Sequence, residues 1–187
     1  MANIDRAITF AAMAHKGTYR KGIGQPYIFH PLEVLSLVSL MTLDDDILCA
    51  AVLHDTVEDT DVSLQDIKEN FSETIAELVS YETEDKRGGI DKGSTWRKRK
   101  EETLSLMEKM PLGSKMICLG DKVSNLRSIH LQYLKEGEKT WESFNQKEPL
   151  QHYWYYNRIK EELKELKDHC VYKEYCFLID VIFSKYL

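Results

Sequence analysis

Apolar residues recur every three to four positions along almost the whole chain, which is the period of an amphipathic α-helix. The first such segment, residues 4–16, places its isoleucines and alanines on one stripe, with Asn3 or Asp5 near the start as a cap. No segment shows the alternation of apolar and polar residues that is typical of a β-strand or hairpin. The pattern therefore predicts an all-α protein.

The other helices follow from the same periodicity together with capping residues, prolines and glycines. We expect them over residues 31–41, 47–58, 64–70, 73–82, 95–110, 114–134, 149–167 and 172–186. Three stretches are predicted as loops: 17–26 and 84–94, which are rich in glycine, and 135–148, which is polar. Within the last loop, Trp141 and Phe144 are expected to anchor part of the chain on the core.

The composition is that of an ordinary globular domain. The chain has 187 residues, of which 43% are hydrophobic and 30% are charged, enough for one domain with a sizeable core. No apolar run is long enough to span a bilayer, and the first residues lack the features of a signal peptide. The cysteines lie in apolar settings without metal-binding spacing, so reduced thiols and a cytoplasmic location are expected: Cys49, Cys118, Cys170 and Cys176.

The charge is unevenly distributed. A net charge of −6 disfavours a general nucleic-acid binder. Nevertheless, seven basic residues crowd into fifteen positions: Lys86, Arg87, Lys92, Arg97, Lys98, Arg99 and Lys100. Cations at 97–100 would oppose the dipole at the start of the helix predicted over 95–110. Either an anionic substrate or the adjacent Glu101 and Glu102 could offset them, and the sequence leaves both alternatives open.

The segment 50–60 carries the strongest chemical signal. An apolar run leads directly into His54, Asp55, Glu58 and Asp59. On a continuous helix, residues four apart share a face, so His54 would lie over Glu58 and Asp55 over Asp59. Three carboxylates at the end of a buried helix are costly without a partner, which favours a bound cation. Because His54 and Asp55 would point about 100° apart, further ligands must come from elsewhere.

Two other segments offer such ligands. His30 precedes a proline at a predicted helix start, and Asp121 interrupts the apolar run 116–120. With His54 and Asp55 they would give two imidazoles and two carboxylates, a set that suits Mn²⁺, Fe²⁺ or another divalent transition metal. Spacing alone leaves the ordinary alternatives open: a loop histidine, a surface acid and a structural histidine–aspartate pair.

Three separated blocks, in order, resemble the hydrolase domain of RelA/SpoT-type alarmone enzymes and of stand-alone small alarmone hydrolases, which are HD-domain metal-dependent phosphohydrolases. They are AHKG…YRK…QPYIFHP within 14–31, LHDTVEDT at 53–60 and GDKVSNLR at 120–127. Gly120 stands where the family usually has alanine. The resemblance implies one HD-type helical bundle over residues 1–187. Larger members of the family also carry synthetase and regulatory domains, for which we expect no room in a chain of this length.

The resemblance also implies roles for individual residues. The family's metal ligands fall on His30, His54, Asp55 and Asp121, and its usual ion is Mn²⁺. Its acidic pair falls on Glu58, expected to position or deprotonate a water, and Asp59, its partner. Its substrate contacts, with one lysine of the basic cluster added at the mouth of the site, are expected to be Arg20, Lys21, Lys86, Asn125 and Tyr153.

The reaction implied by the resemblance is removal of the 3′-pyrophosphate from (p)ppGpp, which leaves GDP or GTP. One alternative keeps the metal site but changes the substrate, for example to a 2′-phosphatase acting on NADPH. Another is a non-catalytic nucleotide sensor, which the presence of every ligand and of the acidic pair disfavours. The expected partner is a small nucleotide, with no nucleic acid and no membrane, and the oligomeric state is left open.

Overall fold

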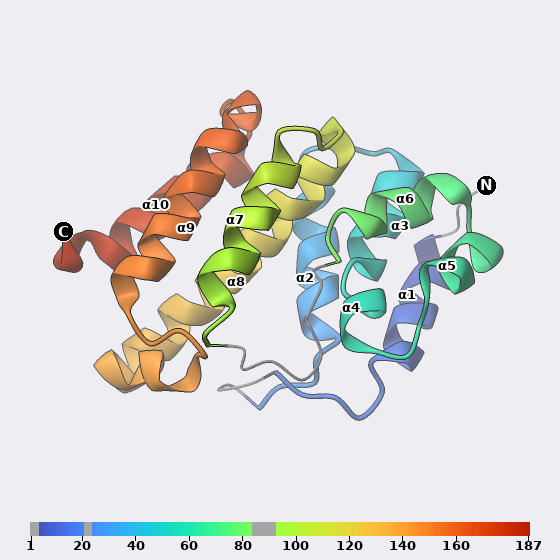
Figure 1. The fold of residues 1–187 in the computed structure, drawn as a ribbon. Coiled ribbons are helices and arrows are strands. Elements are labelled where there is room, and N and C mark those ends of the chain that lie inside the picture. The colour runs from blue at the N-terminus through green and yellow to red at the C-terminus, as the bar shows by residue number, and fades with distance from the viewer. Residues whose placement is uncertain (1–3, 21–23, 84–92) are drawn as a thin grey trace.

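A computed structural model describes residues 4–20, 24–83 and 93–187, and it confirms the all-α prediction (Figure 1). Within these ranges, the extended pairing is a single isolated bridge between Tyr19 and Pro26. The α-helices are α1 (Ile4–Ala14), α2 (Phe29–Val38), α3 (Asp45–Leu53), α4 (Thr56–Asp59), α5 (Leu64–Asn70), α6 (Glu73–Ser80), α7 (Trp96–Met107), α8 (Leu112–Glu136), α9 (Pro149–Glu162) and α10 (Cys170–Phe183). Short 3₁₀ helices follow three of them: η1 (Gly137–Ser143), η2 (Lys164–Leu166) and η3 (Ser184–Tyr186).

Helix α8 is the central element of the fold. It crosses the middle of the molecule, with α1 to α6 on one side and α7, α9 and α10 on the other (Figure 1). Its closest packing partners are α2 and α10. Two apolar clusters result: α8 contributes Ile117 to the one built from α1, α2, α3, α5 and α6, and Leu119 to the one built with α7, α9 and α10. The functional side chains described below lie where these two halves meet.

Several helices begin where their capping residues predict. The Asp44 side chain accepts hydrogen bonds from the backbone N–H groups of Asp46 and Ile47, at 3.0 and 3.1 Å. Ser63 forms a reciprocal capping box at the start of α5, and Ser72 caps α6. These side chains satisfy N–H groups that the first turn of a helix leaves without partners.

Other predicted boundaries were wrong. The helix expected over 47–58 is interrupted, because α3 ends at Leu53 and α4 begins at Thr56. Helix α2 begins at Phe29, two residues before the predicted start. The helix expected over 149–167 ends at Glu162 and is followed by η2.

The polar segment 135–148 is more ordered than a loop. Helix α8 continues to Glu136, and η1 follows directly. The predicted anchoring is confirmed, because the Trp141 side chain is buried in the cluster around α8 and α10, with Phe144 packed against it. In the loop predicted over 84–94, residues 84–92 lie outside the described residues.

Gly120 allows α8 to approach α2 closely. A Cβ atom at this position would lie 3.0 Å from Cγ2 of Val38 and 3.3 Å from Cγ1 of Val34. The absence of a side chain therefore brings the next residue, Asp121, next to the start of α2. Among the described residues, no helix has the length and apolar character needed to cross a membrane.

Candidate metal centre

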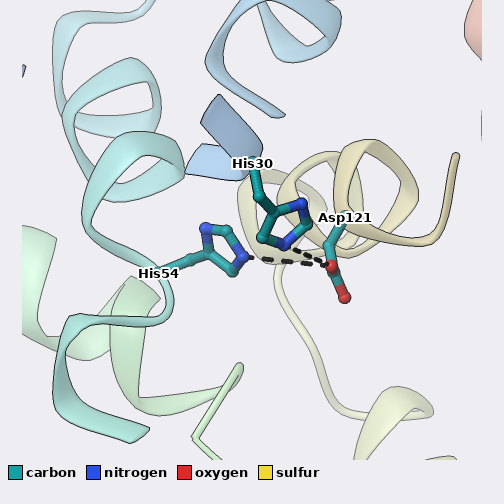
Figure 2. Close-up of side chains that lie close together, drawn as sticks. All are labelled: His30, His54 and Asp121. Atoms are coloured by element: carbon teal, nitrogen blue, oxygen red, sulfur yellow. Dashed lines mark ion pairs between the residues drawn. The ribbon is translucent and has the colours of Figure 1, made fainter. Parts of the chain in front are cut away.

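Three buried side chains from separate elements converge on one point. His30 is the second residue of α2, His54 follows α3 directly, and Asp121 lies in the middle of α8. One donor atom from each lies within 4.8 Å of the other two. Figure 2 shows both imidazoles directed at the Asp121 carboxylate. The close approach of α8 to α2 and the end of α3 thus build the cluster.

Asp55 joins the same cluster. Its Oδ2 atom lies 3.2 Å from His30 Nε2 and 3.1 Å from His54 Nε2. The Oδ1 atom of Asp121 lies 3.1 and 3.9 Å from the same two nitrogens. Ligand atoms that bind one transition-metal ion at about 2.0–2.2 Å are separated by about 3–4 Å from one another. His30, His54 and Asp121 therefore have the spacing of a metal-binding set, and Asp55 adjoins it through its contacts with both imidazoles.

The hydrogen bonds of His54 direct a lone pair into this cluster. Its Nδ1 atom lies 2.8 Å from the carbonyl oxygen of Ala51, which can only accept, so Nδ1 carries the proton. The Nε2 atom is buried and lies 3.1 Å from Oδ2 of Asp55, without a well-aligned hydrogen bond to it. A buried nitrogen this close to a carboxylate oxygen, but without an aligned hydrogen bond, needs an explanation, and a cation held between the two atoms supplies one. The residues present thus fit a divalent metal ion.

The turn between α3 and α4 explains how two adjacent residues reach one centre. The carbonyl oxygen of Leu53 accepts a hydrogen bond from the Thr56 hydroxyl at 2.6 Å, as that of Ala51 does from His54. At Asp55 the backbone leaves ideal helix geometry, with φ −93° and ψ −4°. Consequently His54 and Asp55 do not diverge by the 100° expected on a continuous helix, and both face the cluster.

Tyr27 connects the cluster to the acidic pair. Its hydroxyl lies 2.7 Å from Oδ2 of Asp55 and 2.7 Å from Oδ2 of Asp59. Burial and the two carboxylates raise the pKa of Tyr27, so the phenol stays protonated and can donate. Sequence reasoning assigned it no role, although it lies within the first family-like block, three residues before His30.

The carboxylates of the cluster are held ionised. Burial would raise the pKa of Asp55, but the imidazoles of His54 and His30 hold it well below its ordinary value. For Asp121, the Lys122 ammonium outweighs burial in the same way, and Lys122 in turn has a raised pKa because of Asp121. Ionised carboxylates are the form that binds a metal ion.

Glu82 is a titratable group of the site that sequence reasoning missed. Burial raises its pKa to about 7, with Asp121 adding to the rise and Lys122 opposing it. Its Oε1 atom is buried and has no hydrogen bond within the described ranges. Glu82 follows α6 outside the three family-like blocks, so no sequence signal marked it.

Two connected cavities adjoin the cluster. The first, of about 410 Å³, contains the metal set, the acidic pair, Glu82 and a group of basic and aromatic residues. The second, of about 490 Å³, has among its lining residues His15, Thr18, Tyr19, Arg20 and Phe144. Tyr27, Glu58, Asp59 and Arg99 line both. Each volume is in the range of small-molecule sites, about 300–1,000 Å³.

The expected substrate contacts are only partly brought together. Arg20 donates to Oδ1 of Asn125 at 2.6 Å, and Asn125 donates to Oδ1 of Asp121 at 2.5 Å, so both residues adjoin the metal cluster. Lys21 and Lys86 lie outside the described residues. Tyr153 packs against Phe183, with ring centroids 5.9 Å apart, and it lines neither cavity.

A different tyrosine of α9 lines the cavity in which Tyr153 was expected. Tyr155, two residues later on α9, lines the metal cavity. A helix turns by about 100° per residue, so Tyr153 and Tyr155 lie on different faces of α9. The ring of Tyr155 faces the cavity, and the ring of Tyr153 packs against Phe183. The expectation for Tyr153 is therefore not supported by its placement.

The basic residues at 97–100 include examples of both alternatives, pairing on the helix surface and facing a substrate site. The Arg97 guanidinium lies 3.2 Å from the centre of the Trp154 ring and pairs with Glu101 at 2.8 Å, as a solvated helix face would. In contrast, Arg99 and Lys100 line the metal cavity. These two cations therefore lie where an anionic substrate would bind.

Comparisons with known proteins agree with this geometry. Residues 7–148 match the family model described as HD domain, and the chain therefore belongs to the HD domain family. A buried histidine–aspartate cluster in such a fold indicates a divalent metal site. The resemblance to RelA/SpoT-type hydrolase domains is also confirmed by individual relatives.

One relative is a GTP pyrophosphokinase of Streptomyces coelicolor, 34% identical over 171 residues, which are 89% of this chain and 19% of the relative. Another is a guanosine-3′,5′-bis(diphosphate) 3′-pyrophosphohydrolase of Vibrio cholerae. It is 35% identical over 166 residues, which are 85% of this chain and 23% of the relative. The chain thus spans about a fifth to a quarter of these curated relatives. A solved structure of a metazoan ortholog of SpoT that hydrolyzes ppGpp aligns with a TM-score of 0.76 at 26% identity, covering 100% of this chain and 96% of that one.

Proposed function

We propose that this protein is a metal-dependent phosphohydrolase that removes the 3′-pyrophosphate from (p)ppGpp and releases GDP or GTP. The observation that carries the proposal is the buried cluster of His30, His54 and Asp121, opening on a cavity that contains the acidic pair and several cations. The names of the Vibrio relative and of the metazoan ortholog support this substrate.

The proposed ion is Mn²⁺, held by His30, His54, Asp55 and Asp121. Two imidazoles and two carboxylates form a mixed nitrogen and oxygen set that suits it. When bound, the cation would lower the pKa of a water and offset negative charge on the phosphate.

Glu58 and Asp59 are proposed to manage protons during hydrolysis. Glu58 lines both cavities without belonging to the metal set, so its carboxylate can accept a proton from the attacking water. As the bond between phosphorus and the ribose 3′-oxygen breaks, that oxygen must gain a proton. The proton that Glu58 takes from the water can be passed on to this oxygen by way of Asp59, which accepts a hydrogen bond of 2.7 Å from Tyr27.

The remaining walls suit the two ends of a nucleotide. In the metal cavity, the charges of Arg99, Lys100 and Lys122 favour a pyrophosphate group. In the adjoining cavity, the planar guanidinium of Arg20 can stack on a base. Its partner Asn125, which lines the metal cavity, can bind ribose or base.

The proposal is tested with purified, Mn²⁺-loaded protein and either ppGpp or NADPH as substrate. We expect pyrophosphate and GDP from ppGpp, quantified by ion chromatography, and no product with the His54→Ala variant. No pyrophosphate from ppGpp would refute the proposal. Phosphate released from NADPH alone would instead assign the 2′-phosphatase alternative.

A further inference from the structure

A chain of hydrogen bonds leads from His30 away from the cleft. The Nδ1 atom of His30 lies 2.8 Å from the Ser124 hydroxyl, and that hydroxyl donates to Oε2 of Glu33 at 2.6 Å. The other oxygen of Glu33 accepts from Nη1 of Arg127 at 2.8 Å. Arg127 also forms a two-pronged contact with Glu174, at 2.6 and 2.8 Å. The chain thus links α2, α8 and α10.

Arg127, at the end of this chain farthest from His30, determines which group donates in each hydrogen bond. Arg127 has only donors, so Glu33, which it contacts, is stabilised as a carboxylate, and a carboxylate can only accept. Ser124 must therefore give its single proton to Glu33, and its oxygen is left to accept from His30. It follows that Nδ1 of His30 carries a proton, so that in the neutral ring the lone pair lies on Nε2, which faces Asp55 and Asp121.

We propose that Ser124 and Glu33 are positioning residues that hold His30 in the one neutral tautomer able to bind the metal ion. This inference rests on the metal site of the proposed function, but not on its substrate. Ser124 is fully buried on α8, one turn from Gly120 and on the side of α8 that contacts α2. Partners of this kind fix ring orientation and tautomer, and their loss weakens metal affinity by about 10- to 100-fold.

Replacing Glu33 by glutamine would exchange donor and acceptor in the two hydrogen bonds between residue 33, Ser124 and His30. Arg127 would retain the amide oxygen, so the amide NH₂ would face Ser124 and donate to it. The Ser124 hydroxyl would then donate to Nδ1 of His30 and place the ring proton on Nε2, where the metal must bind. Glu33→Ala, by contrast, only removes the acceptor of the Ser124 proton, so either tautomer of His30 becomes possible. A purely structural role predicts the opposite order, because glutamine preserves the shape of the side chain better than alanine does.

The experiment measures Mn²⁺ affinity from the electron paramagnetic resonance signal of free Mn²⁺, with the full chain and without substrate. We expect Ser124→Ala and Glu33→Ala to weaken binding by about 10-fold, and Glu33→Gln by about 100-fold. In a Ser124→Ala background, Glu33→Gln should have no further effect, because the exchange of donor and acceptor requires the hydroxyl. Glu174→Gln is the matched control and should change affinity by less than about 3-fold, since it leaves the chain from Glu33 to His30 intact.

Thermal melts of the metal-free variants establish that each one folds. Wild-type affinity in Glu33→Gln, or a larger loss in Glu33→Ala than in Glu33→Gln, would overturn the inference, as would a wild-type protein that binds no Mn²⁺. If the expected order is found but ppGpp is not hydrolysed, the proposed function fails while the inference holds.

Discussion

Glu58 lies on α4, in the wall common to both cavities, outside the set of side chains that surround the metal position. Substitution by glutamine preserves its shape but removes its ability to accept a proton. We expect Glu58→Gln to lower kcat by about 10²- to 10⁴-fold, the usual contribution of a general base. The bound Mn²⁺, measured by elemental analysis, should remain at the wild-type level. Loss of the metal would instead identify Glu58 as a ligand.

Glu82 allows a prediction about pH, because its pKa of about 7 in the folded protein exceeds its ordinary value of 4.5. Below pH 4.5 the carboxyl is neutral in both the folded and unfolded states. Between pH 4.5 and about 7 the unfolded state loses this proton while the folded state keeps it, so stability falls as the pH rises through that range. In metal-free protein, we therefore expect Glu82→Gln to raise the melting temperature more at pH 8 than at pH 5.

Glu77 provides the matched control for this experiment, because it lies on the same helix, α6, with an exposed side chain. Glu77→Gln should change the melting temperature equally at both pH values. An equal effect of Glu82→Gln at pH 5 and pH 8 would show that Glu82 has an ordinary pKa in the folded protein.

At the scale of elements, helices with local signals could be predicted from the sequence and the turn after α3 could not. Asp44, Ser63 and Ser72 mark helix starts because each side chain bonds to N–H groups only two or three residues away. The turn at His54 and Asp55 contains neither glycine nor proline. It depends on His54 and Thr56 side chains that bond to backbone carbonyls, and these same residue types also occur inside helices.

The site shows the same division. Its metal set could be predicted because three sequence blocks resemble a known domain and carry those residues. The roles of Tyr27, Ser124 and Glu33 depend on contacts of α2, and of the turn before it, with α4 and α8, which are far apart in sequence. Spacing along one chain does not encode such contacts, so only the folded structure shows them.

Gly120 connects helix packing to the metal set. Gly120→Ala gains about 1 kcal/mol in helix propensity but incurs about 1–3 kcal/mol from overpacking against Val34 and Val38. Because Asp121 is the next residue, displacement of α8 from α2 also moves a ligand. We expect a slightly lower melting temperature without metal, together with Mn²⁺ binding that is weaker by about 10-fold, the lower end of the effect of disturbed ligand positioning.

Gly113, near the start of α8, is the control for this variant. A Cβ there would be equally crowded, 3.0 Å from Cδ1 of Ile47, but it would lie far along α8 from Asp121. Gly113→Ala should lower the melting temperature while leaving Mn²⁺ affinity unchanged. If both variants weaken Mn²⁺ binding equally, then general loosening of α8, and not the contact with α2, determines ligand position.

At the scale of the whole molecule, the metal set bridges the two halves of the fold. His30 and His54 belong to elements that pack in the cluster with α1, α2, α3, α5 and α6, whereas Asp121 projects from α8, which also contributes to the other cluster. Without a cation, the ionised Asp55 and Asp121 face each other across the two imidazoles. Metal binding should therefore stabilise the domain as a unit.

The size of this stabilisation follows from mass action. A ligand that binds only the folded state at 100 times its Kd adds about 2.7 kcal/mol. For a domain of this length, each kcal/mol raises the melting temperature by about 2–4 °C, so saturating Mn²⁺ should raise it by roughly 5–10 °C relative to EDTA-treated protein. Scanning calorimetry measures this shift. His54→Ala should abolish the shift, and His130→Ala, a histidine on α8 outside the cluster, should retain it. An equal shift in both variants would place the stabilising metal elsewhere in the chain.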